Sequence, residues 1–218
     1  MEKLLFLIEI ISCRLAHRVL FVSPSIRRTA LARGMCLEKK SRVLINGSFN
    51  GVDALGHFNP QRVTVDRARA EVGIPISALV IGFVGRVVCD KGIIELLMAW
   101  HSLQEQFDDL YLLIVGPMEV KNKIPEEVIG RMMSDPRIRN IRGELDPVNY
   151  YAAMDVFVLP SYREGFGLVA IEASAMNLPV STTRSFMMLR LRYFRSAPLP
   201  PIQQASADSP LPGAVRQA

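Results

Sequence analysis

The chain has 218 residues, of which half are hydrophobic and 22% are charged. This length supports one large domain or one and a half typical ones, and the composition excludes wholesale disorder. The net charge is +5, but residues 184–218 hold five arginines and one aspartate, so the remainder of the chain is close to neutral. A nucleic-acid-binding surface is therefore not predicted for the globular part.

The three cysteines and three histidines are scattered along the chain. Their spacing fits neither a zinc site nor a disulfide framework and is typical of a reducing cytoplasm. The apolar run near the N-terminus contains Glu9 and is not followed by small residues, unlike a signal peptide. No run approaches the ~20 apolar residues of a membrane span. We therefore expect a cytoplasmic protein.

Hydrophobic periodicity predicts regular elements along most of the chain. The first four are a helix at 2–16, a strand at 18–22, a helix at 24–33 that Ser23 caps, and a strand at 42–45. A loop rich in glycine and asparagine follows at 46–60. Regular alternation then predicts helices at 65–72, 91–107, 125–133, 147–154 and 168–176, and strands at 78–84, 111–116, 138–141, 155–160 and 179–183.

The predicted strands are short, continuous apolar runs, which is typical of strands buried on both faces. We therefore predict a doubly wound parallel α/β sheet covered by helices. Ligands of such sheets bind outside the carboxyl ends of the strands, so the loops that follow the strands are the candidate site. Residues 184–218 contain five prolines and no further β–α unit. They are expected to be a disordered tail, with a basic amphipathic membrane-surface segment as the alternative.

Several common motifs are absent from the sequence. The missing G-x-G-x-x-G argues against a nicotinamide-dependent dehydrogenase, and the missing G-x-x-x-x-G-K-[ST] argues against a nucleotide hydrolase. The missing G-x-S-x-G argues against an α/β-hydrolase.

The first candidate loop follows the strand at 78–84. Gly85 allows a tight turn there, Arg86 lies just past the strand, and Lys91 lies at the expected start of the next helix. A guanidinium fork and an ammonium group at this edge suit a diphosphate. A lysine in the first turn of a helix opposes the macrodipole, which indicates an anion to hold. Two solvated surface cations are the alternative.

The second candidate loop follows the strand at 155–160. Glu164 precedes the turn of Gly165, Phe166 and Gly167, and a helix begins directly after it, so its free amides offer an anion site. Glu164 suits sugar hydroxyls, Glu172 suits the two hydroxyls of a ribose, and Phe166 suits stacking on a base or sugar.

Two further groups have competing roles. Ser48, Asn50 and Asp53 either bind a ligand or cap the loop at a domain hinge. Tyr150 and Tyr151 either stack on a ligand or, as we expect, pack their helix against the sheet.

The segments GFVGR, LLIVG and YYAAMDVFVLPSYREGFGLVAIEASAMNLPV occur in this order, after the loop NGSFNGVDALGHFNP. The combination resembles the family-4 (group 1) glycosyltransferases of the GT-B fold, and in particular the bacterial enzymes of capsule, O-antigen and exopolysaccharide synthesis. The resemblance covers about residues 9–183.

The resemblance implies two Rossmann-like domains across a cleft, the C-terminal one binding a nucleotide-diphosphate sugar such as a UDP-sugar. It implies that Arg86 and Lys91 contact the diphosphate, that Glu164 lies by the donor sugar and that Glu172 holds the ribose, with the Gly165–Gly167 amides near sugar and phosphate. It further implies retention of anomeric configuration, no metal or other cofactor, and a saccharide or polyprenyl-linked acceptor at the inner membrane face.

The resemblance also divides the chain. Residues 1–60 match a remnant of the acceptor domain and the interdomain loop, residues 61–183 match an incomplete nucleotide-sugar-binding domain, and residues 184–218 do not match. We therefore expect a fragment that folds unstably alone and does not turn over substrate. The alternatives are a non-catalytic relic that binds a nucleotide diphosphate weakly or not at all, and another GT-B enzyme such as a sugar-nucleotide epimerase.

Overall fold

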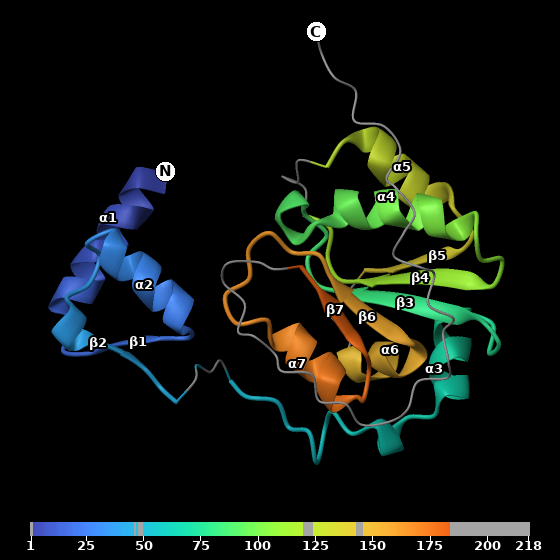
Figure 1. The fold of residues 1–218 in the computed structure, drawn as a ribbon, viewed down its shortest axis with the longest axis horizontal. Coiled ribbons are helices and arrows are strands. Elements are labelled where there is room, and N and C mark those ends of the chain that lie inside the picture. The colour runs from blue at the N-terminus through green and yellow to red at the C-terminus, as the bar shows by residue number, and fades with distance from the viewer. Residues whose placement is uncertain (1, 46, 48–49, 120–123, 143–145, 184–218) are drawn as a thin grey trace, which may run out of the picture.

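The computed structural model describes residues 2–45, 47, 50–119, 124–142 and 146–183. The tail predicted at 184–218 and Ser48 lie outside the described residues. Figure 1 shows the arrangement of the elements, which follow one another along the chain largely as the periodicity predicts.

Helices and strands alternate through most of the chain. The helices are α1 (Glu2–Leu15), α2 (Pro24–Ala32), α3 (Val65–Val72), α4 (Ile93–Gln104), α5 (Glu126–Ser134), α6 (Pro147–Ala153) and α7 (Leu168–Ala175). The strands are β1 (Val19–Phe21), β2 (Ser41–Val43), β3 (Leu79–Val84), β4 (Leu110–Val115), β5 (Ile138–Ile141), β6 (Val156–Leu159) and β7 (Val180–Thr182).

The larger sheet has five parallel strands in the order β5-β4-β3-β6-β7. The chain runs outward from β3 through β4 to β5, then returns to the opposite side of β3 and continues through β6 to β7. Helices α4 and α5 cover one face, and α3, α6 and α7 cover the other (Figure 1). The predicted doubly wound parallel sheet is therefore confirmed.

The core lies between this sheet and its helices. The central strands are buried on both faces, and the fully buried side chains include Val80, Phe83, Leu112, Leu113, Ile114 and Phe157. Both tyrosines of α6 are buried, as expected for side chains that pack their helix against the sheet, and the Tyr151 ring meets Phe157 edge-on. Burial of this apolar area is the main stabilising contribution to the domain.

A separate, smaller sheet near the N-terminus pairs β1 and β2 in parallel. Ser23 caps α2 as predicted, because its Oγ accepts from the amide of Ile26 at 3.3 Å. Helix α1 exposes a row of large apolar side chains, namely Leu4, Leu5, Leu7, Ile8 and Ile11. Within the described residues, no helix combines the length and apolar character needed to cross a membrane.

A buried arginine ties α3 to the amino ends of β3 and β6. The Arg69 side chain donates to the carbonyls of Ala153, Ile76 and Ala78 and forms an ion pair with Asp155 at 2.7 Å. The same carboxylate oxygen accepts from the amide of Val80 at 2.7 Å. Each guanidinium nitrogen of Arg69 therefore has a partner, which is the condition for burying a charge without a large penalty.

Replacing Arg69 should destabilise the sheet because three backbone carbonyls lose a donor and Asp155 loses its counter-charge. We expect Arg69→Met to lower the free energy of unfolding by about 3 kcal/mol in urea denaturation. The matched control is Arg67→Met, since Arg67 is exposed on the same helix, and it should change stability by less than about 0.5 kcal/mol. Equal effects of the two substitutions would contradict a structural role for the Arg69 cluster.

Candidate functional site

The loops after β3 and β6 lie side by side because these two strands pair in parallel, with Ile81 opposite Val156. Backbone contacts then join the loops. The amide of Tyr162 donates to the carbonyl of Asp90 at 3.0 Å, and the buried hydroxyl of Ser161 donates to the same carbonyl at 3.3 Å. The reversal of strand order between β3 and β6 thus brings both predicted loops to one place, where open α/β sheets bind ligands.

Two glycines allow the close approach of these loops and of the loop after β4. Gly92 has φ 72°, and a β-carbon built there would lie 2.1 Å from the carbonyl oxygen of Pro160. A β-carbon built on Gly116 would lie 2.1 Å from the carbonyl oxygen of Gly85. Any other residue at these positions would push the loops apart.

The helix predicted to begin at 91 begins instead at Ile93. Residues Cys89–Lys91 form a short 3-10 turn, and the left-handed conformation of Gly92 separates it from α4. The expectation that Lys91 lies in the first turn of a helix is therefore wrong. Its position cannot be explained by the helix macrodipole, and its carboxylate partner provides the explanation.

Lys91 and Glu164 form an ion pair between the two loops. The Lys91 Nζ and Glu164 Oε2 atoms are 2.5 Å apart, and the side chains are 17% and 14% exposed. Both charges have thus lost most of their hydration, so each depends on the other for compensation. Two of the predicted catalytic residues, 73 positions apart in the chain, are in direct contact.

Arg86 has a different partner. Its guanidinium lies 2.5 Å from Glu119, which follows β4, and both side chains are about half exposed. The pairing therefore directs Arg86 toward the β4 loop rather than toward Glu164. Glu119 is not predicted from the sequence, because nothing in its local pattern distinguishes it from a solvated surface glutamate.

The glycine turn after Glu164 faces the N-terminal part of the chain. Gly167 has φ 75° and precedes α7, whose first amides are free of intrahelical partners. A β-carbon on Gly165 would lie 3.4 Å from Ile26 Cδ1, and one on Gly47 would lie 3.2 Å from the Phe166 ring. The half-buried Phe166 ring thus lies beside Gly47, at the junction of the two parts of the chain.

Glu172 is half-buried on α7 and is bound by α6. Its Oε2 accepts a hydrogen bond from the hydroxyl of Tyr151 at 2.8 Å. Burial raises the pKa of Glu172, while the Tyr151 bond and the nearby His57 oppose this shift. His57 itself lies 3.0 Å from Asp146. The structure therefore joins Glu172 to Tyr151. The sequence offered Tyr151 only for stacking or for packing, and it did not point to His57.

Asp53 caps its own loop. Its carboxylate accepts from the amides of Gly56 and His57 at 2.8 and 3.1 Å. These hydrogen bonds lower the pKa of Asp53, because they favour the charged form. Of the two roles open from the sequence, the structure favours the capping role for Asp53.

The desolvated Lys91–Glu164 pair should show strong energetic coupling. In a double-mutant cycle of Lys91→Met and Glu164→Gln, we expect a coupling free energy of about 1–3 kcal/mol from urea denaturation. The exposed pair Arg86–Glu119 is the matched control, and its cycle should give less than about 1 kcal/mol. If the coupling free energy of Lys91–Glu164 is no larger than that of Arg86–Glu119, burial does not strengthen the ion pair.

The raised pKa of Glu172 makes stability depend on pH. The folded state holds this proton more tightly than the unfolded state does, so the stabilising contribution is lost as the pH rises through the folded pKa. Glu172→Gln removes the titration. The melting temperature of this variant minus that of the wild type should therefore increase from pH 4 to pH 7 in thermal denaturation. A difference in melting temperature that stays constant or decreases over this range would contradict a raised pKa of Glu172.

The comparisons with known proteins agree on one family. The family model described as "Glycosyl transferases group 1" matches residues 78–188. The capsular polysaccharide biosynthesis glycosyltransferase CapM of Staphylococcus aureus is 34% identical over 182 residues, which are 82% of this chain and 46% of that protein. The chain thus spans about half the length, or less, of the curated relatives it matches.

Solved structures agree on the fold. A glycosyltransferase from Rickettsia africae superposes with a TM-score of 0.63 at 25% identity, covering 77% of this chain and 44% of that one. HepE of Anabaena in complex with UDP-glucose superposes with a TM-score of 0.68 at 20% identity, covering 85% and 50%. The predicted GT-B type of fold is confirmed, and the chain belongs to the group 1 glycosyl transferases.

Proposed function

We propose that this chain supplies the donor-binding half of a retaining glycosyltransferase, which moves a hexosyl group from a nucleotide-diphosphate sugar during cell-surface polysaccharide synthesis. The acceptor is a saccharide or a polyprenyl-linked saccharide at the inner membrane face, and the enzyme associates with that face from the cytoplasm. No metal or other cofactor takes part in donor binding. Residues 61–183 form the donor-binding domain, and residues 1–60 belong to the acceptor side.

The observation that supports the proposal best is the Lys91–Glu164 pair at the reversal of strand order. Before the donor arrives, each side chain compensates the charge of the other in a site with little water. When a sugar diphosphate binds, Lys91 is free to turn to the diphosphate and Glu164 to accept hydrogen bonds from sugar hydroxyls. The carboxylate suits this role because it accepts from two donors at once.

The remaining groups suit the rest of the donor. Glu172 accepts hydrogen bonds from the two ribose hydroxyls, and Tyr151 orients its carboxylate from the other side. The amides at the start of α7 and in the Gly165–Gly167 turn bind the sugar and the phosphate. Arg86 exchanges its exposed partner Glu119 for the diphosphate. The backbone amides and Arg86 stabilise the negative charge that develops as the diphosphate leaves. This is the largest electrostatic demand of the reaction.

The nucleotide base is proposed to be uracil. HepE of Anabaena, which shares the fold, has been solved with UDP-glucose, and the Staphylococcus aureus protein TarM, also similar in fold, with UDP. The relatives CapM and TuaC are named for capsular polysaccharide and teichuronic acid synthesis, which supports a cell-surface glycan as the product.

A second candidate function is nucleotide-diphosphate binding without transfer. The observation that favours it is that the Lys91–Glu164 and Tyr151–Glu172 contacts involve only groups proposed for the donor. Transfer needs an acceptor as well as a sugar nucleotide, whereas binding needs only the residues proposed to contact the sugar nucleotide. Those residues all lie within the described part of the chain.

Calorimetric titration of the purified chain with UDP and with uridine tests the proposal. We expect saturable binding of UDP to the wild type. In Glu172→Ala the binding free energies of UDP and uridine should both weaken by about 1.5–3 kcal/mol, because a charge-assisted hydrogen bond is lost. Lys91→Ala and Arg86→Ala should lower the affinity for UDP more than the affinity for uridine. Glu127→Ala, an exposed glutamate of α5, is the control and should bind like the wild type.

Two results would contradict these roles. Unchanged affinity in Glu172→Ala would remove the ribose contact, and equal losses of UDP and uridine in the cation variants would remove the diphosphate contact. UDP binding without transfer to any saccharide acceptor would favour the second candidate function.

A further inference from the structure

A second basic site lies on the smaller sheet, away from the loops of Lys91 and Glu164. A hollow of about 400 Å³ opens beside β2 and the first turns of α2. It is lined by Pro24, Arg27, Arg28, Ser41, Arg42 and Val43. The proposed donor site uses none of these residues.

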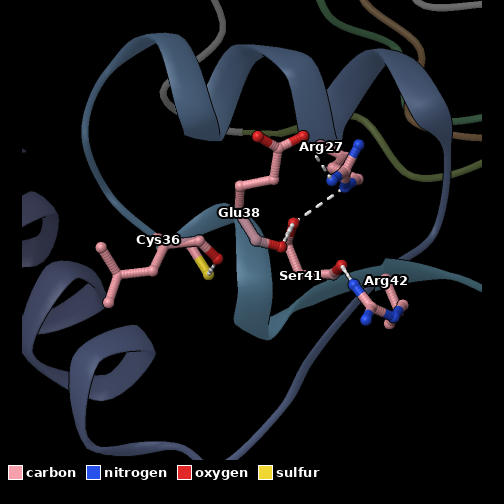
Figure 2. Close-up of polar contacts among 6 residues, drawn as sticks. Arg27, Cys36, Glu38, Ser41 and Arg42 are labelled. Atoms are coloured by element: carbon pink, nitrogen blue, oxygen red, sulfur yellow. Dashed lines mark hydrogen bonds and ion pairs between the residues drawn. The ribbon is translucent and has the colours of Figure 1, made fainter.

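Arg27 is held in position at this hollow. Its Nε donates to the hydroxyl of Ser41 at 2.8 Å, and that serine is fully buried. The hydroxyl in turn donates to the carbonyl of Glu38 at 2.8 Å. Figure 2 shows Arg27 and Arg42 reaching Ser41 from two sides, with the Arg42 guanidinium donating to the serine carbonyl at 2.9 Å. Two guanidinium groups are thus oriented by one buried residue.

Positive charge exceeds negative charge at the hollow. Arg28 is exposed and has neither an ion pair nor a hydrogen bond within the part of the chain that the structure describes. Arg27 pairs with Glu38 at 3.4 Å, but that carboxylate is 81% exposed, so solvent weakens the attraction. Residues 1–45 as a whole contain nine lysines and arginines against three acidic residues.

The position of the arginines is unfavourable unless an anion is present. Arg27 and Arg28 lie near the N-terminus of α2, whose first turn contains no acidic residue. Cations at this end of a helix oppose the macrodipole. A bound phosphate reverses this cost, because guanidinium forks match phosphate oxygens with two parallel hydrogen bonds.

We propose that the hollow binds the phosphate or diphosphate group of a phosphate ester, as an anion site separate from the donor loops. Helix α2 also carries Ile26, which lies beside Gly165 of the glycine turn. The helix that lines the hollow therefore also contacts the glycine turn of the proposed donor site. The anion site follows from the hollow alone, whereas the assignment of its ligand as the phosphorylated acceptor rests on the proposed function.

Titration with inorganic diphosphate in the presence of saturating UDP tests the site, because UDP occupies the donor loops. We expect the double variant Arg28→Gln/Arg42→Gln to bind diphosphate at least about tenfold more weakly than the wild type. These two arginines are exposed, so the melting temperature should not change. Arg18→Gln removes a positive charge from a residue just before β1 that does not line the hollow, and it should weaken binding less than twofold. The affinity for UDP should be the same in all three proteins.

A second arm distinguishes a soluble phosphate ester from a lipid headgroup. Vesicles of phosphatidylcholine with and without phosphatidylglycerol are sedimented with the same proteins. Loss of diphosphate binding in the double variant alone supports the hollow. If binding to the phosphatidylglycerol vesicles falls in the same variant, the ligand is a lipid headgroup, and if vesicle binding is unchanged or absent, it is a soluble phosphate ester. Equal weakening in the double variant and in Arg18→Gln would overturn it in favour of a general charge effect. Vesicle binding without diphosphate binding, or no binding of either probe, would also overturn it.

The test separates the two proposals. If UDP does not bind, the proposed donor site is wrong, and the diphosphate titration without UDP still compares the double variant with Arg18→Gln. If UDP binds and the double variant keeps its diphosphate affinity, the donor site stands and the anion site is wrong.

Discussion

The parallel pairing of β3 with β6 is the constraint on which the candidate site depends. Strands β3, β4 and β5 follow one another toward one edge of the sheet, and the chain then returns to place β6 on the other side of β3. The loops after β3 and β6 are therefore neighbours although their residues are far apart in sequence. Burial of both faces of the central strands makes this order stable, since a slip would expose fully buried side chains. The Arg69–Asp155 cluster secures the opposite, amino end of the same two strands.

Burial gives similar ion pairs different roles. Arg69 is almost completely buried and has a partner for each of its three nitrogens, so its role is structural. Lys91 and Glu164 are mostly buried but lie where two loops meet, so their pairing joins the two loops and is not part of the core. Arg86 and Glu119 are half exposed, and water competes with their attraction. Exchange of a partner for a ligand is therefore easiest at Arg86 and structurally most costly at Arg69.

Contacts across the junction connect the two parts of the chain at the glycine turn. Gly165 lies against Ile26 and Phe166 against Gly47, so the turn that leads into α7 also faces the smaller sheet. The absence of a side chain at Gly47 permits this approach, because a β-carbon there would lie 3.2 Å from the Phe166 ring. Membership in the group 1 glycosyl transferases is consistent with a ligand site at such a junction.

The sequence by itself determined the local structure, the fold class and the family. The helix at 65–72 and the strand at 138–141 match the observed bounds, because hydrophobic period, capping residues and glycines act within a few positions of each other. It also identified the two loops that meet, since continuous apolar strands predict a parallel sheet whose ligands bind at the carboxyl ends.

Only the tertiary structure decided which side chains are partners. The sequence did not reveal that Lys91 pairs with Glu164, Arg86 with Glu119 and Glu172 with Tyr151, nor that α4 begins after Gly92. It also did not reveal the arginine hollow, whose residues lie on α2 and β2, two elements that the Arg27–Ser41 hydrogen bond joins. The physical reason is that these contacts join residues distant in the chain, so strand order and burial set them, and no local pattern encodes either.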